Sequence, residues 1–336
     1  MIPPGRAVQG VHHIRGSSVD NCMVQLAGRF SIYLDLWGRQ HAFTDPTFQR
    51  VTSEPSSPDR EKPMMEISVL LEVANPRDRL VYCKNVDIYN LVGQWIYLLS
   101  GSESVHPIEF YNPIGRRFVD EETNATRLRG AWGARLFGTG SITKAIDLLR
   151  ESPGTRRCVI PVWEQDDLGK NSRNVPCLTS VQFSIKGGRL DCFVTMRSQA
   201  AVGVMPYDLF LLTMLHEYVS VRTGVPMGEY VHFAPLCGIR ESEVETLRKM
   251  EKSTVLPTEM PPMEKLDSGK LALFHYCERK IRRTSIYPIE EVEQLPAYWR
   301  GFLVLALLKA GTRLSFQQIK TFPKDFLDRN LPDEKA

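Results

Sequence analysis

Hydrophobic and polar residues alternate most regularly in the central segment Val175–Asp208. Two predicted strands there carry apolar residues at every second position: Val181, Phe183 and Ile185 in the first, and Leu190, Cys192, Val194 and Met196 in the second. Lys186-Gly187-Gly188 between them predicts a tight turn. A helix is predicted from Pro206, a favourable first helical residue, to the C-cap candidate Gly224. The segment therefore predicts a hairpin followed by a helix.

The other periodic segments predict strands and helices in mixed order. Strands are expected at Met65–Val73, Arg157–Trp163 and Glu229–Ala234. Helices are expected at Val86–Leu99, Ile142–Leu149 after the N-cap candidate Ser141, Glu241–Met250, Lys270–Arg282 and Tyr298–Ala310. Glycine, arginine and proline in 111–117, 128–138 and 253–263 predict long loops, and Val24–Leu36 shows no clean period. The order favours a single α+β domain over residues 1–336.

Composition narrows the class of protein. The chain has 336 residues, 43% of them hydrophobic, and a net charge of only +3, so a broad basic surface for nucleic acid is not expected. Its seven cysteines form no CxxC pair, which fits reduced thiols in a cytoplasmic protein, and no metal site is predicted. No signal peptide is predicted. The longest apolar run, Phe302–Leu308, is far shorter than the ~20 residues that span a bilayer.

The central segment also brings together four reactive or polar groups: the thiol of Cys177, the guanidinium of Arg197, the hydroxyl of Ser198 and the carboxylate of Asp208. This set suits a covalent nucleophile, an anion clamp and a selector for a polar ring. Each member has a simpler interpretation. A cysteine at a strand start is commonly a small buried apolar side chain, and an aspartate at a helix start is favoured by the helix dipole.

Several spaced motifs resemble the thymidylate synthase family, including its pyrimidine hydroxymethylase branch. They are the stretch SPGTRRCVIPVW, the pair Pro176-Cys177, the pair Arg197-Ser198 and the turn GVMPYD, in the order of the family. The resemblance runs from about Asn75 to Arg240, whereas 1–60 and 241–336 are divergent. It implies an α+β fold with a large mixed sheet flanked by helices, packed back to back in a homodimer. It also implies methylenetetrahydrofolate as one-carbon donor to C5 of a pyrimidine nucleotide.

The resemblance assigns roles to individual residues. Cys177 matches the nucleophile that adds to C6 of the ring, which makes C5 a carbon nucleophile. Arg197 matches an arginine that contacts both the phosphate and the thiol, and Ser198 matches a phosphate-binding serine. Arg156 and Arg157 match a pair that reaches the same phosphate across the dimer, where guanidinium forks suit the anion. Each active site would then be built from two chains; the alternative for an Arg-Arg pair is a solvated strand end.

Asp208 bears on the choice of ring. Family members that act on uracil nucleotides carry asparagine at this position, whereas cytosine-specific hydroxymethylases carry aspartate. A carboxylate accepts a hydrogen bond from the N4 amino group of cytosine. The resemblance therefore favours a cytosine nucleotide, CMP or dCMP, as the substrate.

Other positions depart from the family pattern. Gln94 replaces a glutamate that organises proton transfer, and an amide cannot act as an acid or base at neutral pH. Trp132 replaces a tyrosine, and Ala200 replaces an aspartate that contacts the ring and folate. Gly238 and Arg240 replace a His-x-Tyr pair that holds the sugar hydroxyl. We interpret Arg240 as a contact to a different sugar, an extra phosphate or a carboxylate.

Three functions follow as hypotheses. The first is an enzyme of specialised nucleoside or modified-nucleotide metabolism that hydroxymethylates a cytosine nucleotide, with methyl transfer as its variant. The second is a degenerate nucleotide-binding paralogue or partner subunit, favoured by the departures and opposed by the retained Cys177. The third is an unrelated cysteine hydrolase that pairs Cys177 with a histidine. No histidine lies in a stretch that points to this pairing, and His232 is interpreted as structural.

Overall fold

A computed structural model of the protein describes residues 10–40, 63–120, 126–170, 172–312 and 319–331. Its centre is one mixed sheet with the strand order β1-β2-β7-β5-β4-β3, and β6 pairs with β7 at the side of this path. The strands are β1 (Val11–Gly16), β2 (Met65–Val73), β3 (Val159–Pro161), β4 (Leu178–Lys186), β5 (Arg189–Met196), β6 (Gln199–Ala200) and β7 (Met227–Ile239). The pairs β1-β2, β5-β7 and β6-β7 are parallel and the others are antiparallel. The predicted α+β class with a large mixed sheet is confirmed.

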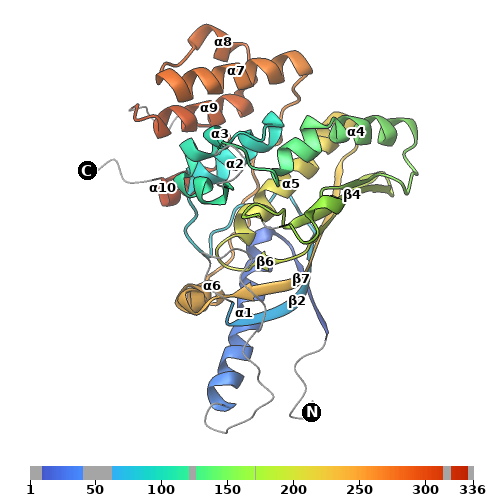
Figure 1. Ribbon diagram of the computed structural model, residues 1–336, viewed down its shortest axis with the longest axis vertical. Coiled ribbons are helices and arrows are strands. Elements are labelled where there is room, and N and C mark those ends of the chain that lie inside the picture. Colours follow the sequence, from blue (N-terminus) through green and yellow to red (C-terminus); the bar gives the residue numbers. More distant parts are fainter. Residues whose placement is uncertain (1–9, 41–62, 121–125, 171, 313–318, 332–336) are drawn as a thin grey trace.

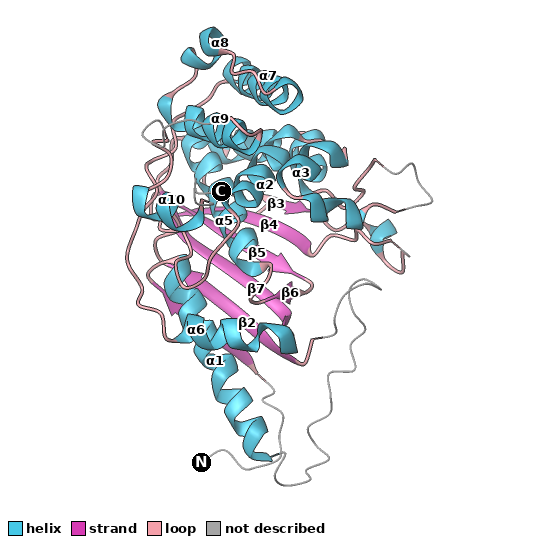
Figure 2. Cartoon of the chain, turned by 90° about the vertical axis from the view of Figure 1, so that its left-hand side faces the viewer, coloured by secondary structure: helices cyan, strands magenta, loops and turns pink. Residues whose placement is uncertain are grey.

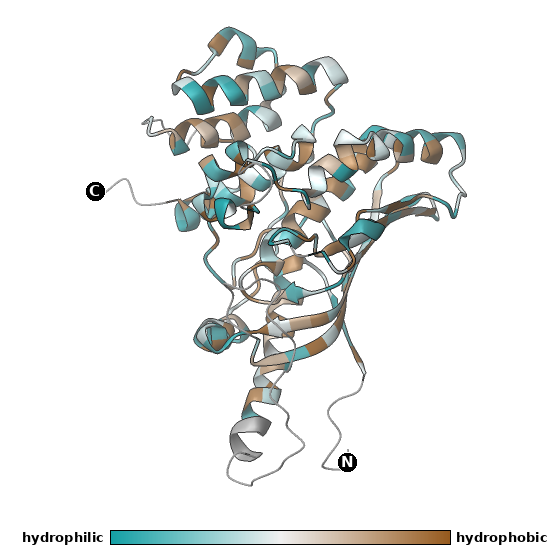
Figure 3. Cartoon of the chain, viewed as in Figure 1, coloured by the Kyte–Doolittle hydropathy of each residue, from teal (hydrophilic) through white to brown (hydrophobic). Residues whose placement is uncertain are grey.

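Helices cover one face of this sheet and extend beyond one end of it (Figures 1 and 2). They are α1 (Val19–Gln40), α2 (Ile88–Ser100), α3 (Val105–Tyr111), α4 (Ser141–Glu151), α5 (Met205–Thr223), α6 (Val244–Glu251), α7 (Ser268–Thr284), α8 (Ile289–Glu293), α9 (Ala297–Lys309) and α10 (Lys324–Asn330). Helix α5 is buried on nearly all sides, as expected for a helix without a polar face. Figure 3 shows that α9 is more hydrophobic than the neighbouring α7. No helix in the described part of the chain is both long and apolar enough to cross a membrane.

The predicted hairpin is present as β4 and β5. Gly187 and Gly188 have φ angles of 55° and 74°, in the left-handed region that glycine adopts without a steric cost. The turn therefore sets the register, in which Phe183 lies opposite Cys192. Both of these side chains are fully buried, so the alternation in the sequence marks the core face of the sheet.

The two faces of the sheet differ in what covers them. On the face toward α5, Tyr230 and His232 of β7 are fully buried. On the opposite face, Val231 pairs with Phe193, and Phe233 pairs with Leu70 of β2. These apolar side chains remain only partly buried in the single chain. A continuous apolar strip therefore crosses three central strands on the face away from the helices.

Several expectations for local structure were wrong. In addition, Val19–Gln40, for which no element was predicted from the sequence, forms α1, and its buried residues have helical spacing: Val19, Cys22, Met23, Leu26, Ala27 and Phe30. The helical period is hard to see in a window that starts at Val24, because the apolar residue Ile32 falls on the exposed side of the helix, where its side chain is 52% exposed. The expected loop 111–117 contains the end of α3 and a 3₁₀ helix, Pro113–Phe118. The expected loop 128–138 contains a π-helix, Ala134–Gly138, and the residue that caps α4 is Gly140 rather than Ser141.

Candidate functional site

A cavity of about 240 Å³ lies where α2, the segment 128–133 and the start of α5 meet. Three of the residues predicted to form the site line it together: Gln94, Trp132 and Asp208. Apolar walls come from Leu98, Ile108, Phe118, Leu128 and Leu211, and further polar groups from Asn90, Asn112 and Asn174. An apolar pocket with a few convergent polar groups is typical of a small-molecule site. Its chemistry, amides around one carboxylate with aromatic walls, suits a flat heterocycle that forms hydrogen bonds.

Asp208 is placed by the start of α5. Pro206 occupies the first turn of that helix, and the backbone N–H of Asp208 donates to the carbonyl of Val204 at 3.2 Å. The carboxylate is 5% exposed, and its Oδ2 accepts a hydrogen bond from Gln199 Nε2 at 2.8 Å. Gln199 reaches it because β6 pairs in parallel with residues 237 and 238 of β7. Asp208 is therefore a buried acceptor in the cavity wall as well as a residue at a helix start.

Cys177 lies immediately before β4 and differs from the other cysteines. All six others are buried, whereas Cys177 is partly exposed. It is not part of the lining of the cavity, but Asn174, three residues earlier, is. Cys177 is therefore close in sequence to a residue that lines the cavity but does not line the cavity itself.

Arg197 at the end of β5 lies beside Cys177. Its backbone N–H donates to the carbonyl of Cys177 at 2.8 Å. Its guanidinium donates from Nε to the carbonyl of Pro176 at 2.9 Å and from Nη2 to that of Val175 at 3.2 Å. The guanidinium carbon also lies 5.6 Å from the centroid of the Trp163 ring. The predicted neighbourhood of Arg197 and Cys177 is therefore present, with the guanidinium holding the backbone that leads to the thiol.

The remaining predicted phosphate contacts lie apart from the cavity. Ser198 follows Arg197 between β5 and β6 and is partly exposed. Arg156 and Arg157 lie in the turn between α4 and β3, and both are exposed. Within one chain the structure does not bring this pair to Asp208 or Gln94. A role for the pair in a second copy of the chain stays a prediction.

Arg240 and Gly238 lie at the end of β7. Arg240 Nη1 is 3.6 Å from Glu243 Oε1, and its backbone N–H donates to Glu243 Oε2 at 3.0 Å. Glu243 therefore offsets part of the charge of Arg240. A Cβ at Gly238 would lie 3.0 Å from Cβ of Pro63 and 3.1 Å from Cγ of Glu66. The residues before and within β2 thus occupy the space that a side chain at 238 needs.

His232 is structural, as interpreted from the sequence. It is fully buried, and its Nδ1 shares a hydrogen bond with the hydroxyl of Tyr230 at 2.9 Å. Burial lowers the pKa of His232 to about 3, so the ring stays neutral at physiological pH. It does not replace the missing His-x-Tyr pair.

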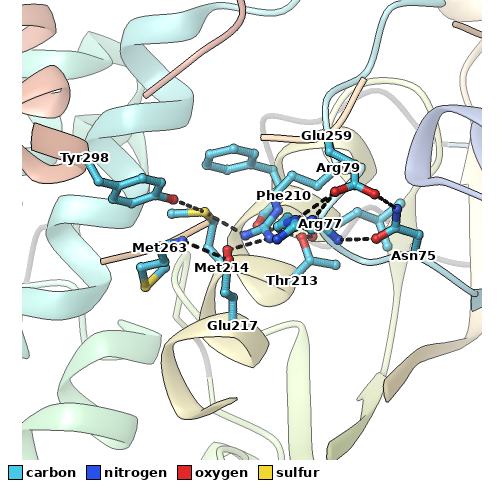
Figure 4. Close-up of polar contacts among 11 residues, drawn as sticks. Asn75, Arg77, Arg79, Phe210, Thr213, Met214, Glu217, Glu259, Met263 and Tyr298 are labelled. Carbon is cyan, nitrogen blue, oxygen red and sulfur yellow. Dashed lines mark hydrogen bonds and ion pairs between the residues drawn. The ribbon is translucent and has the colours of Figure 1, made fainter. Parts of the chain in front are cut away.

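An ion pair anchors the helix that carries Asp208 (Figure 4). Arg79, which is fully buried, donates from Nη2 to Glu217 Oε2 at 2.7 Å and from Nη1 to the sulfur of Met214 at 2.8 Å. Glu217 Oε1 accepts a hydrogen bond from the backbone N–H of Met263 at 3.0 Å. A buried charge without a partner costs several kcal/mol, so these contacts define the position of α5 relative to the proline-rich segment 253–263.

The sequence did not indicate the asparagines of the cavity as site residues. Asn90 lies in the first turn of α2, and Asn112 caps the 3₁₀ helix Pro113–Phe118. The signal for Asn112 was its position before Pro113, which is typical of an N-cap. Asn90 gave no signal, because a polar residue within an apolar helix pattern does not reveal what it faces.

The sequence model of the family described as thymidylate synthase matches residues 79–280, which is more than half of the chain. This chain therefore belongs to the thymidylate synthase family. The match begins at the buried Arg79 and includes every residue predicted to form the site.

Individual relatives are distant. Over 129 residues, 38% of this chain, it is 32% identical to "Thymidylate synthase 1/2" of Encephalitozoon cuniculi (strain GB-M1) and covers 41% of that protein. Over 200 residues, 55% of this chain, it is 24% identical to the thymidylate synthase of Francisella philomiragia subsp. philomiragia and covers 72% of it. Over 178 residues, 48% of this chain, it is 25% identical to "Deoxyuridylate hydroxymethyltransferase" of Delftia phage PhiW-14 and covers 49% of it. The chain thus spans less than half of two of these three relatives.

Proposed function

We propose that this protein transfers a one-carbon unit to C5 of a cytosine nucleotide, CMP or dCMP, and releases the hydroxymethyl product. The observation that carries the proposal is the buried carboxylate of Asp208 in the wall of an amide-lined cavity. A carboxylate accepts a hydrogen bond from the exocyclic amino group of cytosine. The carbonyl oxygen of uracil at the same place cannot donate, so the buried carboxylate oxygen would lose its partner at a cost in free energy. The similarity to a hydroxymethyltransferase and to thymidylate synthases supports the reaction class.

In the proposed reaction, the sulfur of Cys177 forms a bond to C6 of the ring, and the electron pair of the C5–C6 bond makes C5 a carbon nucleophile. Methylenetetrahydrofolate supplies, when bound, a carbon at the oxidation level of formaldehyde. C5 would gain this carbon and lose its proton to solvent, and tetrahydrofolate would leave with the electron pair of its bond to that carbon. Water then contributes the hydroxyl group, and the C6–S bond breaks to return the thiolate. Arg197 would bind the nucleotide phosphate, and its guanidinium also holds the backbone beside Cys177.

In the proposed complex, a folate ring lies next to the pyrimidine in this cavity. Trp132 and Phe118 offer aromatic surfaces and Asn174 offers an amide in the same wall. Gln94 binds in this arrangement without moving a proton, because its amide does not titrate. The proton from C5 therefore goes to water rather than to a side chain at this position.

The proposal includes a homodimer with shared active sites. The partly buried strip of Leu70, Phe193, Val231 and Phe233 gives a second copy an apolar face to cover. Arg156 and Arg157 are exposed at the end of an edge strand, where they are available to the phosphate site of a partner. Both observations support a second copy of this chain as the partner.

A nucleotide-binding protein without turnover is the second candidate. It is favoured by the loss of acid–base groups at Gln94 and Ala200 and by Glu243 beside Arg240. It is opposed by the partly exposed thiol of Cys177, which binding alone does not need.

Tritium release separates the two candidates. The full-length protein is incubated with methylenetetrahydrofolate and [5-³H]CMP, [5-³H]dCMP or the uracil analogues. The enzyme releases tritium to water from a cytosine nucleotide, and Cys177→Ser does not. If calorimetry shows nucleotide binding while no nucleotide releases tritium, the binding protein is the correct description.

A further inference from the structure

A chain of three amide side chains runs from a backbone N–H to the cavity. It begins at Asn112, whose Oδ1 accepts a hydrogen bond from the backbone N–H of Ile114 at 3.1 Å. A backbone N–H only donates, so the oxygen of the Asn112 amide must face Ile114. This contact assigns the amide orientation, because the oxygen and the nitrogen of an amide side chain can otherwise be interchanged. The Nδ2 of Asn112 then points to Asn90 Oδ1, at 3.0 Å.

The orientation passes from Asn90 to Gln94. Asn90 Oδ1 accepts from Asn112, so it must be the oxygen of that amide. The same oxygen accepts a second hydrogen bond from Gln94 Nε2 at 3.1 Å. Because the amide nitrogen of Gln94 donates to Asn90, the Oε1 of Gln94 faces away from Asn90 and is left to accept from another donor.

We propose that this chain makes Gln94 a hydrogen-bond acceptor for the ligand and thereby a residue that determines specificity for cytosine over uracil. The inference rests on the proposed binding of a pyrimidine nucleotide. Gln94 and Asp208 line one cavity and come from different helices, α2 and α5. The N4 amino group of cytosine has two N–H donors, one for each acceptor. The O4 of uracil is itself an acceptor, so it would leave buried acceptors unpaired.

Asn112 and Asn90 act through Gln94 and are positioning residues. Replacing Asn112 by aspartate keeps the acceptor for Ile114 N–H but replaces the donor toward Asn90 with an oxygen. The Asn90 amide must then turn its nitrogen toward residue 112 and Gln94. Gln94 turns in response and presents its N–H₂ to the cavity. The single isosteric change Asn112→Asp therefore reverses both hydrogen bonds between the side chains, from residue 112 to Asn90 and from Asn90 to Gln94.

The experiment is calorimetric titration of CMP and UMP into the full-length protein and its variants. We expect the wild type to bind CMP more tightly, and Asn112→Asp to lower the ratio of the two affinities about tenfold or more in favour of UMP. Asn112→Ala removes the donor to Asn90 without adding an acceptor, so we expect it to lower the ratio less than Asn112→Asp does. Asp147→Asn, on the exposed face of α4, is the control and is expected to keep the wild-type ratio within about threefold.

The outcomes separate this inference from the proposed function. An Asn112→Asp variant that binds CMP with the wild-type preference overturns the amide chain and leaves the proposed function intact. A wild-type protein that binds neither nucleotide overturns both. If Asn112→Asp does not fold in a thermal unfolding assay, Gln94→Met takes its place: it removes the acceptor, and an unchanged ratio overturns the inference in the same way.

Discussion

Gln199 donates a hydrogen bond from Nε2 to Oδ2 of Asp208 over 2.8 Å, and both side chains are buried. This contact takes one oxygen of the carboxylate and orients the group as an acceptor. The Oε1 of Gln199 has no hydrogen-bond partner among the described residues. The pair lies between β6 and α5, so the sheet and the helix together determine how Asp208 faces the cavity.

Asp208→Asn is expected to change the preferred ring. An amide of the same shape offers an N–H₂ to the cavity, so we expect affinity for CMP to fall about tenfold and affinity for UMP to rise. Calorimetry with both nucleotides measures the change. Asp147→Asn, on the exposed face of α4, is the control and should bind both as the wild type does. An unaltered preference in Asp208→Asn would remove Asp208 from ring selection.

Cys177 is expected to be the one thiol that reacts quickly in the native protein. Burial raises the pKa of Cys158 and Cys277 to about 11 and that of Cys22 to about 12, so these thiols stay protonated at pH 8. Brief treatment with iodoacetamide and mass spectrometry should show one modified cysteine in the wild type and none in Cys177→Ser. Bound CMP should slow the labelling. Equal labelling of a buried cysteine would contradict the expected accessibility.

Arg197→Lys tests the clamp beside the nucleophile. Lysine keeps the charge but cannot donate to the carbonyls of both Val175 and Pro176 in the fixed geometry of a guanidinium. We expect the free energy of unfolding to fall by about 1–2 kcal/mol and CMP affinity to fall about tenfold. Cytidine, which has no phosphate, should lose much less affinity. Arg189→Lys in the exposed hairpin is the control, and an equal loss for CMP and cytidine would argue against a phosphate contact.

The buried histidines predict a loss of stability in acid. Burial lowers the pKa of His216 to about 4 and that of His232 to about 3, from the ordinary value of 6.5. The folded state therefore binds fewer protons than the unfolded state below pH 6.5. The stabilisation from keeping these rings neutral is complete above pH 6.5 and is lost progressively as the pH falls toward 4. Each pKa unit corresponds to about 1.4 kcal/mol, so the total effect is several kcal/mol.

Urea unfolding between pH 7.5 and 4.5 measures this slope. His232→Asn removes one titrating group while keeping a hydrogen-bond partner for Tyr230, so the slope should become shallower. His106→Asn is the control, because the side chain of His106 is 59% exposed. A slope that His232→Asn does not alter would show that another group causes the acid sensitivity.

The ion pair of Arg79 and Glu217 is expected to be essential for stability. Removing one partner leaves the other charge buried, so Arg79→Met should lower the free energy of unfolding by about 3–5 kcal/mol. The double variant Arg79→Met, Glu217→Gln should recover part of this loss, since no charge then remains. The exposed pair Lys249–Glu245 is the comparison, where Lys249→Met should cost less than about 1 kcal/mol. A double variant as unstable as the sum of the single variants would contradict this coupling.

The sequence by itself predicted the hairpin, α5 with its C-cap Gly224, and most of the other strands and helices. These elements depend on local physics: period-two burial, two glycines in a turn, and a proline at a helix start. It also marked Cys177, Arg197 and Asp208 through motifs within one short segment. It missed the early part of α1 and the short helices around the cavity, because their buried faces are defined by neighbours that are distant along the chain.

Only the tertiary structure decided which polar side chains face one another. Asn112 lies 22 residues from Asn90, and Gln199 lies nine residues from Asp208. Asn90 lies four residues before Gln94, but nothing in the sequence around it indicates that the two side chains meet. A hydrogen bond between side chains leaves no periodic pattern in the sequence. The same is true of Gly238, where β2 fills the space of a side chain, and of Arg79, whose partner lies on α5. The composition and order of residues determined the fold and the reactive groups. The direction of each hydrogen bond in the cavity depends on how α2, α5 and β6 pack together, because the donors and acceptors come from all three.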